Sequence, residues 1–550
     1  MLNDLTVPRW INQVIEDIDQ CPFANIELVI LNVEPVAPKA SLLKRLFGAN
    51  SEFSKEAFWI YTRIDDRINA ESIDFQRPTQ TGDLLASISR LSVVPHRRRF
   101  VHRFEDDDIR SIRSYNLDVI LRFGFNILKG DILQSAKFGI WSYHHDDNRE
   151  YRGGPAMFWE LWDQNPITGT ILQILNENLD GGDVIYRSYA GTAQTMWLSR
   201  ARQCPYWKAS TFVIRSLRHT YQNGSPTISE SAETVPYTKK IYRTPTNGQM
   251  LSFLLNSAGR SVAARARNRL MSNDWYIAYR VNPKLPLAES NILDIAEFSE
   301  VEAPDGHYYA DPCVIDREEA SHIFFEDFDE RSGKGAISHI CIDDRGQCSK
   351  PRTVLEADYH QSYPFVFEWQ DEVYMVPESA GNRAVKLYKA KRFPHDWEYV
   401  VDLLTGCAAV DATIFEHEKL WYLFANISER GGALHDELFL FFAETPLGPW
   451  QPHPLNPVKS DVRSARPAGR LFWHKGRLIR PAQDCSGTYG RRLVLCVVDK
   501  LTPDIYRERA VSPINTSSDS SITGLHTLSA TEKIEVIDYR RRKWKWGRLQ

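Results

Sequence analysis

The pattern of apolar and polar positions changes along the chain and divides it into parts. Over residues 1–190, apolar positions at helical spacing alternate with short continuous apolar runs. From about residue 276 onward, short strand-like runs follow one another with turns between them. The first pattern is typical of an α/β sheet and the second of an all-β fold. We therefore predict an α/β domain over 1–190, a helical linker over 191–275 and an all-β domain over 276–550.

The first domain is expected to be a doubly wound, Rossmann-like α/β unit. Five apolar positions between Trp10 and Ile18 recur at helical spacing and predict an amphipathic helix. Buried strands are predicted at Ile26–Leu31, Val119–Leu121 and Gly139–Tyr143, whereas only Met1–Val7 is available for a first strand, which must be short. Because ligands bind beyond the carboxyl ends of strands in such sheets, His144 is expected at the functional edge.

The middle region carries two helix-like segments. Residues 206–221 predict an amphipathic helix, and residues 250–271 predict a second one that contains four arginines, Arg260, Arg265, Arg267 and Arg269. A basic amphipathic helix can lie on a membrane surface or be a solvated linker, so a peripheral membrane contact stays open. The basic and aromatic end of the chain, residues 540–550, has the same two interpretations, a membrane contact or a disordered tail.

The last region contains an internal repeat. Similar segments, each a strand, a tight turn and a second strand, begin at Ala310, Ser362, Val410 and Ala465. With Asp311, Tyr363, Asp411 and Arg466 taken as equivalent, the intervals are 52, 48 and 55 residues, and residues 524–526 offer a weaker fifth copy. This period is typical of propeller blades. We predict a five-bladed β-propeller closed by pairing of residues 275–281 with the chain end.

Composition narrows the functional classes. At 550 residues the chain is too long for one ordinary core, and a net charge of −4 gives no basic surface for nucleic acid. The eight cysteines are scattered without CxxC spacing, which predicts a reducing compartment and no disulfide framework. No leader and no apolar run of about 18 residues is present, so we expect a cytoplasmic protein without a transmembrane segment.

The block between His144 and Asp180 carries the most specific chemistry. Five short elements occur in order, which are FGFNIL from Phe123, FGIWSYH ending at His144, Tyr151-Arg152-Gly153, Thr168-Gly169 and LDGGD from Leu179. Together they resemble the folate-dependent formyltransferase family, which includes methionyl-tRNA, glycinamide-ribonucleotide and sugar formyltransferases. The spacing of 36 residues from His144 to Asp180 also resembles that family.

The resemblance implies a role for each matching residue. An amine that attacks the formyl carbon of 10-formyltetrahydrofolate forms an oxyanion and loses a proton, so the site needs a proton acceptor and oxyanion donors. By resemblance, His144 and Asp180 are catalytic. The same resemblance assigns folate binding to Phe123, Gly124 and Asp183, and substrate binding to Tyr151 and Arg152.

One position departs from the family pattern. Ser142 stands where the family has asparagine, which replaces an amide donor by a shorter hydroxyl. Loss of one oxyanion donor costs on the order of 10² to 10³ in rate unless another group substitutes, and His145 is a candidate substitute. Ser142 is therefore a third candidate catalytic residue, and a scaffold that retains the fold without activity is the alternative.

Metal and phosphate sites are weaker interpretations of the same block. The run from His144 to Asp147 could supply ligands, but adjacent loop residues rarely converge on one ion, so no metal is expected. The glycine pairs at 153–154 and 181–182 lack phosphate-loop spacing and are better explained as turns.

The repeat region resembles five-bladed propellers of furanosidase-like glycoside hydrolases, and more closely the propeller-like region of glucosaminyl inositolphosphorylceramide transferases. YADPCVI, VDATIF and SDVRSARPAGR carry this resemblance. Equivalent repeat positions should ring one end of the central channel, which predicts a substrate-binding pocket formed by Asp311, Tyr363, Asp411 and Arg466. In the hydrolases, one aspartate is base or nucleophile, a second tunes it and a glutamate is the acid; Asp311, Asp411 and Glu378 match these roles. Alternatively, these residues cap turns and pair with one another.

The sequence thus favours a formyltransferase that transfers a formyl group from 10-formyltetrahydrofolate to an amino group of an amino sugar or glycan precursor held by the propeller. The alternative is a glycan-binding or glycan-processing propeller protein with a degenerate formyltransferase-like domain.

Overall fold

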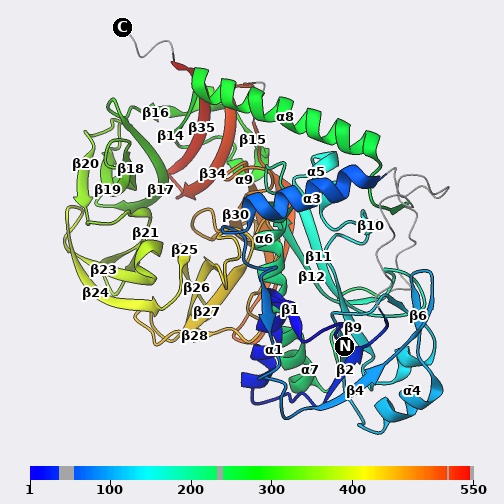
Figure 1. Cartoon of the computed structure of the whole chain (residues 1–550). Coiled ribbons are helices and arrows are strands. Elements are labelled where there is room, and N and C mark those ends of the chain that lie inside the picture. Colours follow the sequence, from blue (N-terminus) through cyan, green and yellow to red (C-terminus); the bar gives the residue numbers. More distant parts are fainter. Residues whose placement is uncertain (36–54, 232–239, 517–518, 546–550) are drawn as a thin grey trace. The chain divides into compact units, whose positions relative to one another are not determined.

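The computed structural model describes residues 1–35, 55–231, 240–516 and 519–545 (Figure 1). The chain forms two compact units, residues 1–261 with 430–432 and residues 262–429 with 433–550. None of the helices in the described part of the chain combines the length and apolar character needed to cross a bilayer.

The first unit contains a four-stranded mixed sheet, which includes two of the three predicted strands, and a separate two-stranded sheet, which includes the third. The four-stranded sheet has the members β7 (Ile120–Arg122), β9 (Ile140–His144), β11 (Ile167–Ile174) and β12 (Asp183–Gly191), which are hydrogen-bonded in the order β12-β11-β9-β7. β7 and β9 are parallel, and β11 is antiparallel to both of its neighbours. β2 (Leu28–Asn32) pairs in parallel with β4 (Ser89–Val93). The three predicted strands are confirmed, with shifts of one or two residues.

The start of the chain links these two groups of strands. The N–H of Leu2 donates to the Ile30 carbonyl at 2.9 Å, and the N–H of Phe123 donates to the Met1 carbonyl at 3.1 Å. Residues 1–3 therefore lie between β2 and β7, where a short first strand was predicted. The rest of the predicted segment turns away, since β1 (Thr6–Pro8) pairs with β3 (Pro78–Gln80).

Helices cover this sheet and bury its apolar face. The predicted first helix is α1 (Arg9–Gln20), whose Val14 and Ile15 pack with Phe212 and Val213 of α7 (Phe212–Asn223). The predicted helix over 206–221 is two helices, because α6 (Leu198–Ala209) ends where Ser210 and Thr211 bond back to the preceding carbonyls. Residues 198–223, placed in a linker by the sequence, thus contribute side chains to the core of the first unit.

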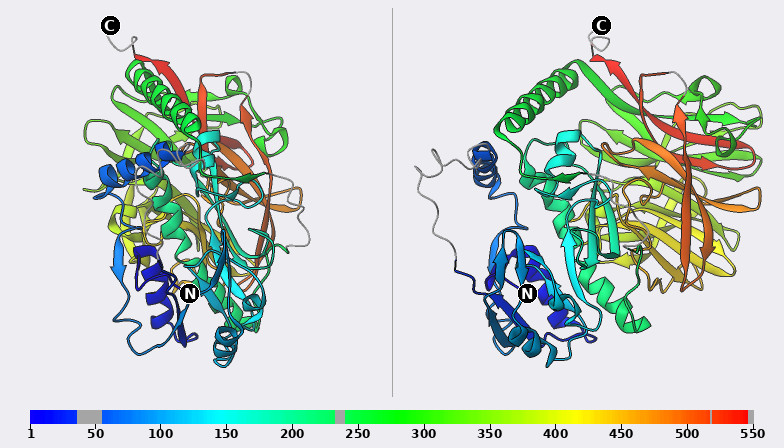
Figure 2. Two further views of the ribbon diagram at one scale, coloured as in Figure 1. Left: turned by 45° about the vertical axis from the view of Figure 1, so that its right-hand side comes forward. Right: turned by 90° about the vertical axis from the view of Figure 1, so that its right-hand side faces the viewer.

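Four further helices occur in the described residues, and the last of them begins in the first unit and ends in the second. They are α3 (Glu56–Asn69), α4 (Asp106–Arg113), α5 (Phe158–Asp163) and α8 (Asn247–Leu270), and α8 is the long helix near the top of both views in Figure 2. Phe58 and Tyr61 of α3, Phe158 of α5 and Phe253 of α8 share one apolar cluster. The predicted basic helix over 250–271 is confirmed as α8.

The second unit contains five four-stranded antiparallel sheets that follow the repeat. Four of them are β17–β20 (307–355), β21–β24 (362–405), β25–β28 (409–452) and β29–β32 (472–513). The fifth combines β16 (Ser299–Val301), β14 (Met271–Val281), β35 (Ile534–Trp544) and β34 (Ile522–Ala530). In Figure 1 the colours pass from green through yellow and orange to red around these sheets. The unit is a five-bladed propeller.

The fifth blade closes the ring with the two ends of the repeat region. All eleven residues of β14 pair with β35, from Met271 opposite Trp544 to Val281 opposite Ile534. The predicted closure by residues 275–281 is confirmed. Arg540–Trp544 lie in β35, so the interpretation of this segment as a disordered tail is wrong; residues 546–550 lie outside the described part of the chain.

Bulges place the repeat-equivalent residues at special backbone positions. The pairing of the first two strands of a blade shifts register between Ala310 and Cys313, between Ser362 and Phe365, and between Val410 and Thr413. At these bulges Asp311, Tyr363 and Asp411 have φ angles of 52°, 42° and 52°. Bulges re-aim side chains, and left-handed φ values in non-glycine residues occur often at functional positions.

Candidate functional site

In the first unit, the structure brings His144 and Asp180 together. His144 ends β9 and is 8% exposed, and its Nδ1 lies 3.6 Å from Oδ1 of Asp180, whose side chain is 14% exposed. The other ring nitrogen, Nε2, lies 2.8 Å from the carbonyl oxygen of Tyr151. That carbonyl can only accept, so Nε2 carries a proton and Nδ1 is the ring nitrogen that faces Asp180.

Asp180 is held by backbone groups. Its Oδ2 accepts the N–H of Gly153 at 3.0 Å, and its own carbonyl accepts from the Asn148 amide at 3.1 Å. Its φ angle is 52°, which turns the carboxylate from the loop before β12 toward His144. Glycine is needed at position 182, since a Cβ on Gly182 would lie 2.0 Å from the carbonyl oxygen of Ile174.

Ser142, the departure from the family pattern, has a cationic partner that the sequence did not predict. Nη1 of Arg122 donates to Oγ of Ser142 at 2.8 Å, and the same guanidinium donates to the carbonyls of Phe125 and Asn126. Burial lowers the pKa of Arg122, and the Asp180 carboxylate opposes this change. A guanidinium therefore lies where the family resemblance implies a neutral amide, and it is a donor able to stabilise an oxyanion.

The remaining predicted residues of this block have mixed positions. Tyr151 contributes its carbonyl to His144, and Arg152 donates to the carbonyl of Leu179 beside Asp180. Phe123 packs with Trp10 in the core, Gly124 lies against the backbone of Asn3, and Asp183 pairs with Ile174 at the start of β12. In the described part of the structure, Phe123 and Gly124 thus have core contacts that do not include His144.

His145 does not replace the missing amide. Its ring stacks on Tyr206 at 3.7 Å between ring centres and lies edge-on to Trp10 at 5.2 Å. Burial, with the nearby His144 and Arg202, lowers its pKa well below the ordinary value. His145 is therefore a neutral ring in an aromatic cluster, and its contacts differ from those of His144.

In the propeller, Asp411 and Arg466 form a buried ion pair beside Glu378. Nε and Nη2 of Arg466 lie 2.5 and 3.0 Å from the two carboxylate oxygens of Asp411. Nη2 is 3.8 Å from Oε2 of Glu378, and this same oxygen accepts the backbone N–H of Asp411 at 3.3 Å. Gln483 adds an amide donor to Asp411 at 2.8 Å. Three of the predicted pocket residues therefore form one cluster.

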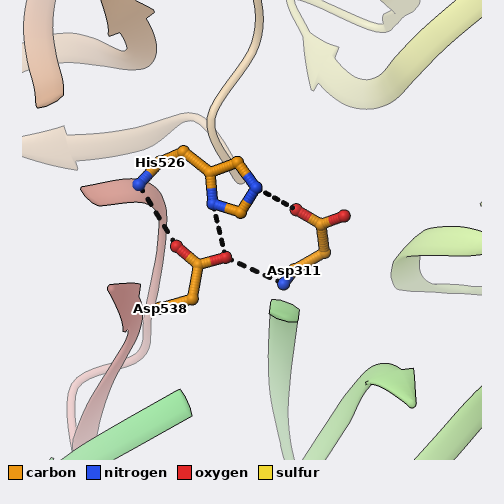
Figure 3. Close-up of side chains that lie close together, drawn as sticks. All are labelled: Asp311, His526 and Asp538. Carbon is orange, nitrogen blue, oxygen red and sulfur yellow. Dashed lines mark hydrogen bonds and ion pairs between the residues drawn. The ribbon is translucent and has the colours of Figure 1, made fainter. Parts of the chain in front are cut away.

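Asp311, the fourth predicted polar residue, belongs to a chain of three charged groups (Figure 3). Nε2 of His526 lies 3.3 Å from Oδ1 of Asp311, and Nδ1 lies 2.6 Å from Oδ2 of Asp538. Asp538 also accepts the N–H groups of Asp311, His526 and Thr527. His526 is the weaker fifth repeat position of the sequence, at a bulge between Leu525 and Thr527.

Ligand atoms of Asp311, His526 and Asp538 lie within 4.8 Å of one another, which raises the question of a metal ion. Each ring nitrogen of His526 already faces a carboxylate, so neither is available to an ion unless that contact breaks. The arrangement fits a chain that shares and moves protons better than a set of metal ligands.

Burial and like charge distribute protons unequally over this cluster. Burial raises the pKa of Asp311 to about 6, with Asp411 and Asp538 adding to the effect and His526 opposing it. Burial and neighbouring carboxylates also raise the pKa of Glu378 and of Glu326 well above the ordinary value. Burial alone would lower the pKa of His526, but Asp538 and Asp311 outweigh it and raise that pKa. Glu378 and Glu326 therefore favour their protonated forms, whereas His526 favours its charged form.

Tyr363 has a different position from its repeat equivalents. Its hydroxyl lies 2.8 Å from Oγ1 of Thr413 and accepts the N–H of Gly469 at 2.7 Å. These two contacts link the second blade to the third blade and to the segment that precedes the fourth. Tyr363 is therefore a cross-blade support, and its hydroxyl is engaged by the protein itself.

Among the acidic and amide residues of the second strands, sequence reasoning found Glu378 but missed Glu326, Asn426 and Gln483. Glu326 pairs with Ala310, Glu378 with Ser362 and Asn426 with Val410, and Gln483 donates its N–H to the Arg466 carbonyl. Asn426 is fully buried and, among the described residues, its amide has no hydrogen-bond partner. The signal was present as FFE, VPE, FAN and PAQ at equivalent places of the repeat, with VID at Asp538 in the closing blade.

Comparisons with known proteins find similarity to two different kinds of protein. Residues 277–535, somewhat less than half of the chain, match the family described as glucosamine inositolphosphorylceramide transferase 1, N-terminal. The rice (Oryza sativa subsp. japonica) protein of that name is 36% identical over 210 residues, which cover 38% of this chain and 28% of the relative. The methionyl-tRNA formyltransferase of Prochlorococcus marinus (strain MIT 9312) is 32% identical over 79 residues, 14% of this chain and 24% of the relative.

Among solved structures, the catalytic domain of a GH62 α-L-arabinofuranosidase from Coprinopsis cinerea matches with a TM-score of 0.33 and 14% identity, over 48% of this chain and 97% of that structure. The chain spans less than a third of the length of the rice and cyanobacterial relatives that it matches. Its propeller half is thus similar to proteins named as transferases, and a short stretch of the chain is similar to formyltransferases.

Proposed function

We propose that this chain is a carbohydrate-directed transferase whose α/β unit transfers a formyl group from 10-formyltetrahydrofolate to an amino group of an amino sugar or glycan precursor. The observation that carries the proposal is the contact of His144 with Asp180, two residues 36 positions apart that the family resemblance pairs. The similarity of a short stretch to methionyl-tRNA formyltransferases supports the reaction type, and the similarity of the propeller to a transferase of glucosamine supports the substrate class.

The reaction balances with the groups present in the α/β site. The acceptor amine attacks the formyl carbon, the bond from that carbon to N10 of the folate breaks, and the amine proton passes to N10, which leaves tetrahydrofolate. Nδ1 of His144 beside Asp180 serves as the exchanging position, and the Arg122 guanidinium at Ser142 supplies the positive charge that stabilises the oxyanion.

The test measures tetrahydrofolate released from 10-formyltetrahydrofolate with glucosamine-containing acceptors. We expect His144→Ala and Asp180→Asn to lower turnover on the order of 10²-fold or more, and Ser142→Asn to be tolerated. His145→Phe is the matched control, because His145 contacts only aromatic rings in the described structure. Equal turnover of all four variants, or no folate turnover by the wild type, would contradict formyl transfer.

A second function is favoured by the chain from Asp538 through His526 to Asp311. A carboxylate whose pKa is about 6, next to protonated Glu378, is suited to acid–base chemistry on a sugar at the propeller cluster. This alternative predicts that Asp311→Asn abolishes glycan turnover without any folate requirement, whereas His144→Ala leaves it unchanged. Retained glycan turnover in Asp311→Asn would exclude it.

A further inference from the structure

Side chains fix the backbone of the loop that carries Asp180. This loop, residues 175–182, connects β11 to β12. Each of its last four residues has a backbone group that contacts a different side chain. The contacts are those of Arg152 with the Leu179 carbonyl, Asn148 with the Asp180 carbonyl at 3.1 Å, Asn176 with the Gly181 carbonyl at 2.7 Å, and Gln173 with the Gly182 N–H at 3.1 Å. The backbone of Asp180 is therefore placed by the side chains around it.

Asp180 needs such support because its backbone conformation is unfavourable. Its φ angle of 52° lies in the left-handed region, which costs free energy in residues other than glycine. Relaxation to a negative φ would turn the carboxylate, whose Oδ1 lies 3.6 Å from Nδ1 of His144. A hydrogen bond to the Asp180 carbonyl opposes this rotation, since the carbonyl and the side chain turn together about the N–Cα bond.

The donor of that hydrogen bond, Asn148, is fully buried and has a fixed orientation. Its Oδ1 accepts from Nη2 of Arg187 at 2.9 Å, while its Nδ2 donates to the Asp180 carbonyl. A guanidinium can only donate, so the amide oxygen must face Arg187 and the amide N–H groups must face Asp180. Arg187 thereby selects the orientation of Asn148 that supports Asp180.

Arg187 is in turn held by carboxylates. It lies on β12 with its side chain 10% exposed, and it donates to Asp147 at 2.7 Å and to Glu230 at 3.0 Å. Burial would raise the pKa of Glu230, but the hydrogen bond from Arg149 and the charge of Arg187 lower it. Glu230 is therefore ionised and keeps Arg187 in place. A continuous series of contacts runs through Glu230, Arg187, Asn148, Asp180 and His144.

From these contacts we propose that Asn148, oriented by Arg187, is the positioning residue that holds the Asp180 carboxylate against His144. The inference rests on the proposed function and adds to it a residue that acts on formyl transfer through Asp180. Asn148 differs from side chains that only border the site, because it holds the backbone of Asp180 itself. Its loss therefore moves the carboxylate.

The kinetic test uses Asn148→Asp, which keeps an oxygen for Arg187 and removes only the donor to Asp180. We expect kcat for formyl transfer to fall about tenfold, whereas KM for 10-formyltetrahydrofolate changes by less than about twofold. In an Asp180→Asn background, the same substitution should alter turnover by less than about twofold, because its effect passes through Asp180. Effects of the two substitutions that multiply would overturn the proposal.

The matched control is Asn178→Asp, which makes the same change in the same loop. Asn178 is exposed, and its side chain makes no hydrogen bond within the described part of the chain, so kcat should stay within about twofold of the wild type. Equal losses in the two Asn→Asp variants would overturn the proposal. Thermal unfolding establishes that each variant is folded. Should Asn148→Asp fail to fold, Arg187→Lys tests the same contacts, since lysine keeps the charge but loses the fork, and kcat should fall about threefold.

A spectroscopic measurement separates this inference from the proposed reaction. The ¹⁵N chemical shifts of the His144 ring report its contact with Asp180 without any turnover. We expect Asn148→Asp to move these signals in the same direction as Asp180→Asn, and Asn178→Asp to leave them in place. Unmoved His144 signals in Asn148→Asp would overturn the positioning role. Moved signals in a protein without formyl transfer would support that role and contradict the proposed function.

Discussion

The two candidate sites differ in what holds their charged groups. In the α/β unit, backbone groups position the charged side chains. The Tyr151 carbonyl contacts the His144 ring, and the Gly153 N–H donates to the Asp180 carboxylate. In the propeller, charged side chains hold one another, as Asp411 holds Arg466 and Asp538 holds His526. A backbone-held site can lose a side chain and keep its geometry, whereas a side-chain-held site loses the support of every neighbour.

The largest effect is expected when the ion pair of the propeller is broken. Arg466→Met leaves the Asp411 carboxylate buried without its cation, and this should lower the free energy of unfolding by about 3–5 kcal/mol. Urea unfolding followed by tryptophan fluorescence measures the change. Arg477→Met, at an exposed position on β30, is the control and should alter stability by less than about 0.5 kcal/mol. A small effect at Arg466 would remove the contrast between the two sites.

The next largest effect is expected at Asp538, whose carboxylate contacts a charged side chain and also accepts backbone N–H groups. Asp538→Asn removes the charge that faces His526 and weakens the hydrogen bonds that three backbone N–H groups donate to residue 538. We therefore expect the free energy of unfolding to fall by about 2–3 kcal/mol. The pKa of His526 should also fall, because Asp538 is the strongest group that raises it. Proton titration of histidine-labelled protein by NMR reads this shift. An unchanged titration of His526 would show that Asp311 alone sustains its charge.

A smaller effect tests the backbone-held site. Gly182→Ala places a methyl group 2.0 Å from the Ile174 carbonyl oxygen and should displace the loop that contains Asp180. We expect the free energy of unfolding to fall by about 1–3 kcal/mol. Formyl transfer should fall by more than stability explains, because the Asp180 carboxylate moves from His144. Gly248→Ala, on α8 with open space around its Cβ, is the control and should be neutral or slightly stabilising. Formyl-transfer kinetics and thermal unfolding are measured for both variants. Unchanged kinetics in Gly182→Ala would contradict the prediction.

The smallest effect is expected at Glu160 and Asp146, two acidic side chains of the α/β unit that lie close together and so differ from its backbone-held site. Burial raises the pKa of Glu160 to about 7 from an ordinary value of 4.5, and it also raises that of its neighbour Asp146. The folded state therefore holds a proton that the unfolded state has released, so stability should fall as the pH rises from about 4.5 to 7. Glu160→Gln should reduce this fall, while the raised pKa of Asp146 preserves part of it, and should stabilise the protein by about 1–2 kcal/mol at pH 8, with little change at pH 5.

Thermal unfolding across that pH range provides the measurement for Glu160. The exposed Glu27→Gln is the matched control and should follow the wild type at every pH. A wild-type stability that rises with pH between 5 and 7, uncorrected by Glu160→Gln, would contradict the assignment.

The sequence predicted local pattern well and long-range contacts unevenly. The repeat period and the alternation of strands and turns were sufficient to predict the five blades and the closure by β14, because each blade repeats the same pattern of apolar positions. The contact of His144 with Asp180 followed from a family motif within one short stretch. Arg122 was missed, since its role depends on burial beside Ser142, which no spacing encodes. Asp538 was missed because its partner Asp311 lies more than two hundred residues earlier.

The closure of the propeller by its last strand has a consequence for biosynthesis. β35 supplies Asp538, and it pairs with β14, which leaves the ribosome more than 250 residues earlier. Until residues 534–544 have been translated, β14 lacks its partner and His526 lacks its main counter-ion. The proton-sharing centre of the propeller therefore depends on the closing strand and is complete only when β35 has paired with β14.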